Sequence, residues 1–106
     1  KDNFKGKINQ KTSINELILL GLYLLSQEKE KINFENLLEK CFKLSPQLIS
    51  VENHDWPDAR KLSRPLRGLR NKNLIQGSPQ SGFSLTLKGK KEALEISKKL
   101  YQGKLL

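Results

Sequence analysis

Residues 60–89, RKLSRPLRGLRNKNLIQGSPQSGFSLTLKG, decide the fold of this 106-residue chain. Their first twelve residues place leucines and basic residues on opposite faces of a helix with 3.6 residues per turn. Apolar and polar residues then alternate around SPQS, which predicts a hairpin with strands over 74–77 and 82–86. Thr86 precedes a further helical pattern. This order predicts a mainly α fold with a small β-hairpin, of the α+β class.

Helix signals recur along the rest of the chain. Ser13 opens a capping-box pattern, and Asn33 can cap a helix in the same way. Pro57-Asp58 is typical of a helix start. Pro65 predicts a kink or a division in the third helix. The expected elements are a first helix over 13–27, a short strand at Ile32, a second helix over 34–44, a third helix over 57–72, the hairpin, and a last helix over 87–101.

These elements form one expected domain, residues 13–101. Residues 1–12 lack periodicity and are interpreted as a flexible basic leader or the remainder of a tag, and residues 102–106 as a tail or the start of a linker. The chain begins with lysine and contains no methionine, so we expect it to be a piece of something longer. Cys41, the one cysteine, lies on an apolar helical face and is interpreted as a small buried hydrophobe.

The connection over residues 45–56, SPQLISVENHDW, is longer than the tight turn of a simple helix-turn-helix. His54 is the only histidine, and without a second ligand nearby it indicates a loop or capping role. The apolar residues of the connection are expected to pack back onto the core: Leu48, Ile49, Val51 and Trp56.

The first helix carries more apolar surface than a single core-facing stripe requires. Residues 17–25, LILLGLYLL, are apolar on nearly every side. Two explanations stay open: the helix is central and covered by the others, or it contacts a homodimer partner or a neighbouring domain. A second dimer surface is suggested by apolar residues near the C-terminal end: Leu100, Tyr101, Leu105 and Leu106.

Charge is distributed very unevenly along the chain. Residues 1–12 carry +3, residues 13–59 carry −4 and residues 60–106 carry +10, which gives the formal net charge of +9. Such a field attracts a polyanion to one face. All four arginines lie in the third predicted helix, and guanidinium groups suit phosphate oxygens and the edge of guanine. They are Arg60, Arg64, Arg67 and Arg70.

The sequence offers no catalytic centre. It contains no nucleophile paired with a base, no glycine-rich phosphate loop and no cluster of metal ligands. We therefore expect no enzyme activity, no cofactor and no metal. The longest apolar stretch is too short to span a bilayer, so no membrane partner is expected. The expected location is the cytoplasm, at the nucleoid if the polyanion attracted by the basic face is DNA.

One stretch of the chain also carries a family pattern. Its residues are Leu62, Leu66, Leu69, Asn73-Leu74-Ile75, Gly77, Gly82-Phe83, Leu85-Thr86-Leu87-Lys88-Gly89 and Ala93. With the order α-β-α-α-β-β-α, they resemble the recognition helix, the wing and the LT-x-x-G start of the last helix in winged helix-turn-helix domains of prokaryotic DNA-binding proteins. Residues 13–56 match only in helical pattern.

The resemblance implies a double-stranded DNA-binding module, acting as a transcription regulator or as the targeting part of a larger protein. The third helix, 57–72, would lie in the major groove and the 77–82 wing at the backbone. The implied helix contacts are Arg60, Lys61, Arg64, Arg67 and Asn71. The implied wing-tip contacts are Ser78, Gln80 and Ser81, and further phosphate contacts come from Lys88, Lys90 and Lys91.

Two features limit what the resemblance implies. The wing tip lacks the arginine or lysine often found there, and the 45–56 connection is longer than usual, which can alter the angle at which the third helix is presented or shield part of it. Arg70 lies nearer the buried edge of the third helix, where we expect it to pair with an acid. Many winged helices bind only proteins, so the alternative is a protein-interaction or dimerisation module without DNA binding.

Overall fold

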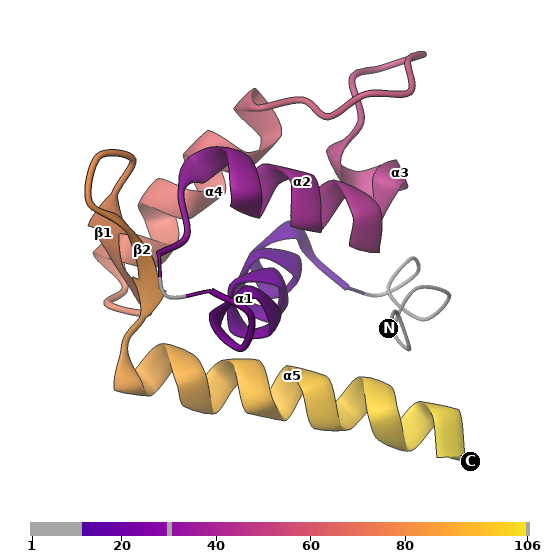
Figure 1. Ribbon diagram of the computed structural model, residues 1–106. Coiled ribbons are helices and arrows are strands. Elements are labelled where there is room, and N and C mark those ends of the chain that lie inside the picture. Colours follow the sequence, from indigo (N-terminus) through magenta and orange to yellow (C-terminus); the bar gives the residue numbers. More distant parts are fainter. Residues whose placement is uncertain (1–11, 30, 106) are drawn as a thin grey trace.

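The computed structural model of the chain describes residues 12–29 and 31–105. Figure 1 shows helix α1 at the centre, with α2 and α4 on one side, α5 on the other and the hairpin at one end. Within the described residues, no helix combines the length and apolar composition needed to cross a bilayer. The elements are α1 (Ile14–Ser26), α2 (Phe34–Leu44), α3 (Pro46–Ile49), α4 (Arg60–Asn71), β1 (Ile75–Ser78), β2 (Gly82–Leu85) and α5 (Leu87–Leu105).

The mainly helical architecture with one antiparallel hairpin confirms the predicted α+β class. The first two helices begin where their caps predict. Ser13 and Glu16 form a complete capping box at α1, and Asn33 forms the same reciprocal pair with Asn36 at α2. Each pair satisfies two backbone N–H groups that a helix start otherwise leaves unpaired.

Helix α1 is the central helix of the domain, which decides between the two explanations of its apolar surface. It packs against α2, α4, α5 and β2. Its buried residues cover nearly its whole circumference: Leu17, Ile18, Leu19, Leu20, Gly21, Leu22 and Leu25. The surface that suggested a partner is therefore used within the chain. The side chains of residues 100–105, and Leu106 as a whole, lie outside the described part, as do residues 1–11 of the expected leader.

Cys41 lies on α2 where this helix crosses α1. A Cβ atom added to Gly21 would lie 3.2 Å from the Cys41 Sγ, so the glycine allows the two helices to approach closely. The thiol is fully buried, with Sγ 3.9 Å from the Leu17 carbonyl oxygen. Burial raises the pKa of the Cys41 thiol to about 12, because the apolar surroundings disfavour a thiolate. The interpretation as a buried hydrophobe is confirmed.

Helix α4 begins three residues later than predicted. Pro57 lies outside it, in an isolated bridge with Ser50, and the helix starts at Arg60. At the N-terminal end of α4, the Asp58 Oδ1 accepts the Arg60 backbone N–H at 3.0 Å, which satisfies one of the N–H groups that a helix start leaves unpaired. Pro65 does not divide the helix, which continues to Asn71. The Pro57-Asp58 pair therefore lies just before the helix start and not inside the helix, because the bridge to Ser50 holds Pro57 in the preceding loop.

A junction of hydrogen bonds links the end of α4 to the start of α5. Asn73 has a left-handed φ of 66°, and the Leu74 N–H donates to the Leu69 carbonyl at 3.0 Å, which closes α4. The Thr86 hydroxyl donates to the Asn73 carbonyl at 2.7 Å and accepts the Gly89 N–H at 3.0 Å. Thr86 therefore caps α5, as predicted, and fastens it to the residue at which the hairpin leaves α4.

The hairpin has a register of Ile75 with Leu85 and Ser78 with Gly82. Each strand is shifted or shortened by one residue relative to the prediction. The Phe83 N–H donates to the Ile32 carbonyl at 2.8 Å, so the predicted short strand at Ile32 is confirmed as a single bridge to β2. Gly77 has a φ of 108°, and a Cβ there would lie 1.9 Å from the Gly82 carbonyl oxygen. This close approach requires glycine.

The 45–56 connection contains α3 and then a projecting loop, visible at the top right of Figure 1. Ile49 is fully buried, as expected, and Leu48 is packed against the core. Trp56 contradicts the prediction, because 55% of its surface is exposed. The last helix also continues to Leu105 instead of ending near Tyr101.

Two glycines offer a matched test of the junction. A Cβ at Gly89 would lie 2.0 Å from the Leu74 carbonyl oxygen, whereas at Gly68 it would meet nothing within 4 Å. Gly89→Ala should lower the free energy of unfolding by about 1–3 kcal/mol through the clash, whereas Gly68→Ala should raise it by up to about 1 kcal/mol through helix propensity. Urea unfolding followed by circular dichroism measures both. Equal effects would show that the junction does not constrain residue 89.

The buried thiol gives a second prediction. Because the pKa of Cys41 is raised to about 12, the native protein should react with a thiol reagent at pH 8 at least about 100-fold more slowly than the urea-unfolded chain, in which the thiol titrates normally. A colorimetric disulfide reagent measures the rate. Comparable rates in both states would contradict a buried Cys41.

Candidate nucleic-acid interface

Helix α4 has one buried face and one cationic face. Leu62, Leu66 and Leu69 are buried, and α4 packs with them against α1 and β1. Because successive residues are 100° apart, the basic residues fall on the opposite side. The predicted site residues on this cationic face are Arg60, Lys61, Arg64, Arg67 and Asn71, of which Lys61 is half-buried and the others exposed.

Arg64 and Arg67 are the two cations of this face whose side chains have no polar partner among the described residues. Neither makes a hydrogen bond or an ion pair with any residue in the described part of the chain. They are three residues apart on the same helix face, so they repel each other. Their ten guanidinium N–H donors are therefore available to an anionic ligand.

Arg60 and Lys61 are partly engaged by the segment that precedes the helix. The Arg60 Nε lies 3.4 Å from the Asp58 carboxylate, although the Arg60 side chain remains 90% exposed. The Lys61 ammonium donates to the Ser50 carbonyl at 2.6 Å. An ion pair this exposed is weak and leaves the guanidinium largely free, whereas Lys61 holds the preceding loop against the helix.

These side chains line a shallow hollow on the surface of α4. It contains three guanidinium groups and one ammonium, against the single carboxylate of Asp58. Such a surface can bind phosphate oxygens or the acceptor edge of a base. Its lining residues are Ile14, Asp58, Arg60, Lys61, Ser63, Arg64, Pro65 and Arg67.

Arg70 has a structural contact, but not the one predicted. Its Nη1 donates to the Gly77 carbonyl at 2.9 Å, where an acidic partner was expected. The side chain is exposed and reaches from the last turn of α4 to β1, close to the turn of the hairpin. Arg70 therefore braces the hairpin against α4.

The hairpin tip uses most of its polar groups internally. Ser78 and Ser81 exchange backbone-to-hydroxyl bonds of 3.2 and 3.1 Å, and their hydroxyls lie 3.0 Å apart. These bonds fix the turn and reduce what either serine can offer to a ligand. Gln80 is exposed and, within the described residues, makes no hydrogen bond. Of the three predicted tip contacts, Gln80 has the freest side chain.

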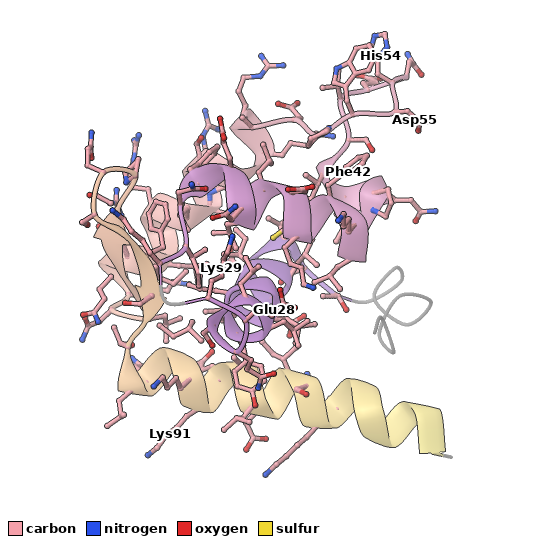
Figure 2. All side chains as sticks on the ribbon, viewed as in Figure 1. Glu28, Lys29, Phe42, His54, Asp55 and Lys91 are labelled. Atoms are coloured by element: carbon pink, nitrogen blue, oxygen red, sulfur yellow. The ribbon has the colours of Figure 1, made fainter. Side chains whose placement is uncertain are left out.

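The three predicted lysines of α5 do not form one group with the arginines. Lys88 and Lys90 are exposed in the first turn of α5, next to the hairpin. Lys91 lines a hollow with Glu16, Glu92, Glu95 and Lys99, in which three carboxylates face two ammonium groups. Figure 2 shows Lys91 on the outer side of α5, away from α4.

Sequence reasoning missed the residues that shape the N-terminal end of α4. Asp58 and the Ser50 carbonyl fasten the loop to the helix, and the His54 and Trp56 rings stack on each other. The Pro57-Asp58 pattern indicated a role for Asp58 at the helix start. No local pattern predicts the contact of Lys61 with the Ser50 carbonyl or the stacking of His54 on Trp56. Among the described residues, no group of three potential metal ligands occurs.

Comparisons with protein-family models, with curated proteins and with solved structures find no match to this chain. The site is therefore interpreted from its own geometry and charge.

The Arg70 contact can be tested without any ligand. Arg70→Met should accelerate hydrogen exchange of the hairpin amides by roughly fivefold, because an exposed hydrogen bond is worth about 1 kcal/mol. Arg67→Met, which removes the same charge but no contact, should leave exchange unchanged. Amide exchange followed by NMR measures both. Identical exchange in the two variants would show that Arg70 does not brace the hairpin.

Proposed function

We propose that this domain is a winged-helix module that binds double-stranded DNA, with α4 as the recognition helix and the β1–β2 hairpin as the wing. The observation that carries the proposal is the pair Arg64 and Arg67 on the exposed face of α4, to which no described residue of the chain binds. Two close guanidinium groups raise the energy of the free protein unless an anion lies beside them. A polyanion relieves that repulsion and is drawn to this half of the chain by its +10 charge.

The shape of α4 suits a major groove. An α-helix fits the groove, and a helix with an apolar back can enter it while remaining packed on its own domain. In this arrangement, Arg64, Arg67 and Asn71 face base edges, and an arginine can bind the O6 and N7 atoms of guanine with two hydrogen bonds. Arg60 contributes a phosphate contact from the helix start.

The wing and the start of α5 supply backbone contacts in the same proposal. Lys88 and Lys90 lie beside the hairpin and neutralise phosphates, whereas Lys91 takes no part because it faces a carboxylate-lined hollow. The wing contributes Gln80 and backbone N–H groups. Arg70 sets the inclination of the wing relative to α4 and acts as a positioning residue.

Salt dependence tests the proposal. Fluorescence anisotropy of a labelled 20-bp duplex should give an affinity whose logarithm falls with log salt at a slope of about −4 to −5, as expected for four to six phosphate contacts. Arg60/Arg64/Arg67→Ala should make the slope shallower by about 1, through the lost Arg60 phosphate contact, and should abolish most of the binding through the lost base contacts. A charge-matched control, Lys29/Lys43/Lys98→Ala, removes three positive charges from other faces and should keep the steep slope.

Two results would contradict the proposal. A folded wild-type domain that does not bind duplex at low salt would exclude DNA binding by this domain. Equal losses in the arginine variant and the matched control would show that net charge, and not the α4 face, attracts the duplex.

A further inference from the structure

The loop that precedes α4 is a structured projection. The Val51 N–H donates to the Trp56 carbonyl at 2.9 Å, and the His54 N–H donates to the Val51 carbonyl at 3.0 Å. The Ser50–Pro57 bridge closes its base, and the Asp58 N–H donates to the Ile49 carbonyl at 2.7 Å. These bonds fix the loop, residues 51–56, beside the first turn of α4.

The loop presents an aromatic stack to solvent. The ring centroids of His54 and Trp56 lie 4.4 Å apart with an interplanar angle of 15°. More than half of the Trp56 surface remains exposed, although an indole ring is among the most favourable groups to bury. Tryptophan is enriched among the residues that contribute most to the binding energy of interfaces. The stack holds the indole in one orientation before any ligand arrives.

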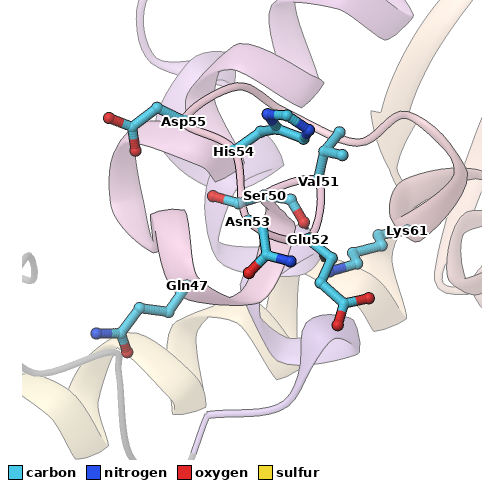
Figure 3. A pocket seen from close by; sticks show the side chains of 8 residues that line it. All are labelled: Gln47, Ser50, Val51, Glu52, Asn53, His54, Asp55 and Lys61. Carbon is cyan, nitrogen blue, oxygen red and sulfur yellow. Dashed lines mark hydrogen bonds between the residues drawn. The ribbon is translucent and has the colours of Figure 1, made fainter.

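The aromatic loop adjoins the cationic face of α4. Lys61 lines both the hollow of the loop and the hollow that contains Arg60, Arg64 and Arg67. Figure 3 shows Lys61 extending toward the loop, with His54 and Asp55 at the outer part of the loop. The two hollows therefore share Lys61, and a ligand seated on the arginines lies next to the hollow of the loop.

The charges of the loop indicate which part of a nucleic acid it can contact. Glu52 and Asp55 are both exposed, so the loop repels phosphates and cannot act as a backbone clamp. Its aromatic rings carry no such penalty, because every nucleobase offers a π-face for stacking. Inside a duplex these faces are covered by neighbouring base pairs. An open face is offered by an unpaired base beside the duplex.

We infer that the His54–Trp56 loop is a stacking platform for an unpaired base, and that the ligand of this domain is a duplex adjoining a single-stranded segment. The inference rests on the proposed function, because α4 must hold the duplex for the loop to receive the base. It specifies the class of DNA: a duplex with an overhang or junction in place of a continuous one.

Matched DNA ligands test this inference. A duplex with a single-stranded overhang of about five nucleotides, at the 3′ or the 5′ end, should bind about 5- to 100-fold more tightly than the blunt duplex of the same length, which is the range expected for stacking one base. Trp56→Ala should remove the difference and leave blunt-duplex affinity unchanged. Trp56→Phe keeps a π-face and should retain part of the preference. Thermal unfolding checks that each variant folds.

Trp56 also reports on the contact directly, because it is the only tryptophan of the chain. Its fluorescence should be quenched by the overhang duplex and far less by the blunt duplex at equal saturation. Equal affinity and equal quenching for both ligands would overturn the inference, as would an overhang preference that survives in Trp56→Ala. In either case, blunt-duplex binding that depends on the arginines would leave the proposed function intact.

Discussion

The relative positions of α4, the hairpin and α5 depend on Thr86. Its hydrogen bonds join the backbone after α4 to the backbone in the first turn of α5. Thr86 bonds to the Asn73 carbonyl and to the Gly89 N–H, and its own N–H donates to the Leu74 carbonyl at 3.1 Å. These bonds hold the C-terminal end of α4 against the N-terminal end of α5. They also fix the direction in which the hairpin leaves α4. Gly89 permits this close packing of α5 against the end of α4, because a Cβ atom there would lie 2.0 Å from the Leu74 carbonyl oxygen.

Much of this arrangement is encoded locally and could be predicted from the sequence. Serine or asparagine caps, a threonine before a helical pattern and glycines around a turn act over three or four residues, so they are visible without the fold. The start of α4 was predicted wrongly because proline is equally suited to a helix start and to an extended bridge. Only the position of Ser50, across the loop, decides between the two.

Part of the candidate site could also be predicted from the sequence, and part could not. The opposition of arginines and leucines on α4 follows from helical periodicity. The engagement of Arg60, Lys61 and Arg70 does not, because their partners are Asp58, the Ser50 carbonyl and the Gly77 carbonyl, and two of these three are backbone atoms that sequence patterns cannot identify. The exposure of Trp56 was likewise not predicted, because tryptophan side chains are highly buried on average and no local pattern marks this one as exposed.

The central position of α1 has a consequence for how the protein is made. Among the described elements, α1 is made first and α5, which packs along it, is made last. An almost wholly apolar helix is therefore left partly uncovered until α5 has been made, and exposed surface of this kind promotes aggregation. The basic residues that dominate the second half of the chain confer solubility only once they have been made. Nascent chains that stall before α5 therefore expose this surface and are prone to aggregate.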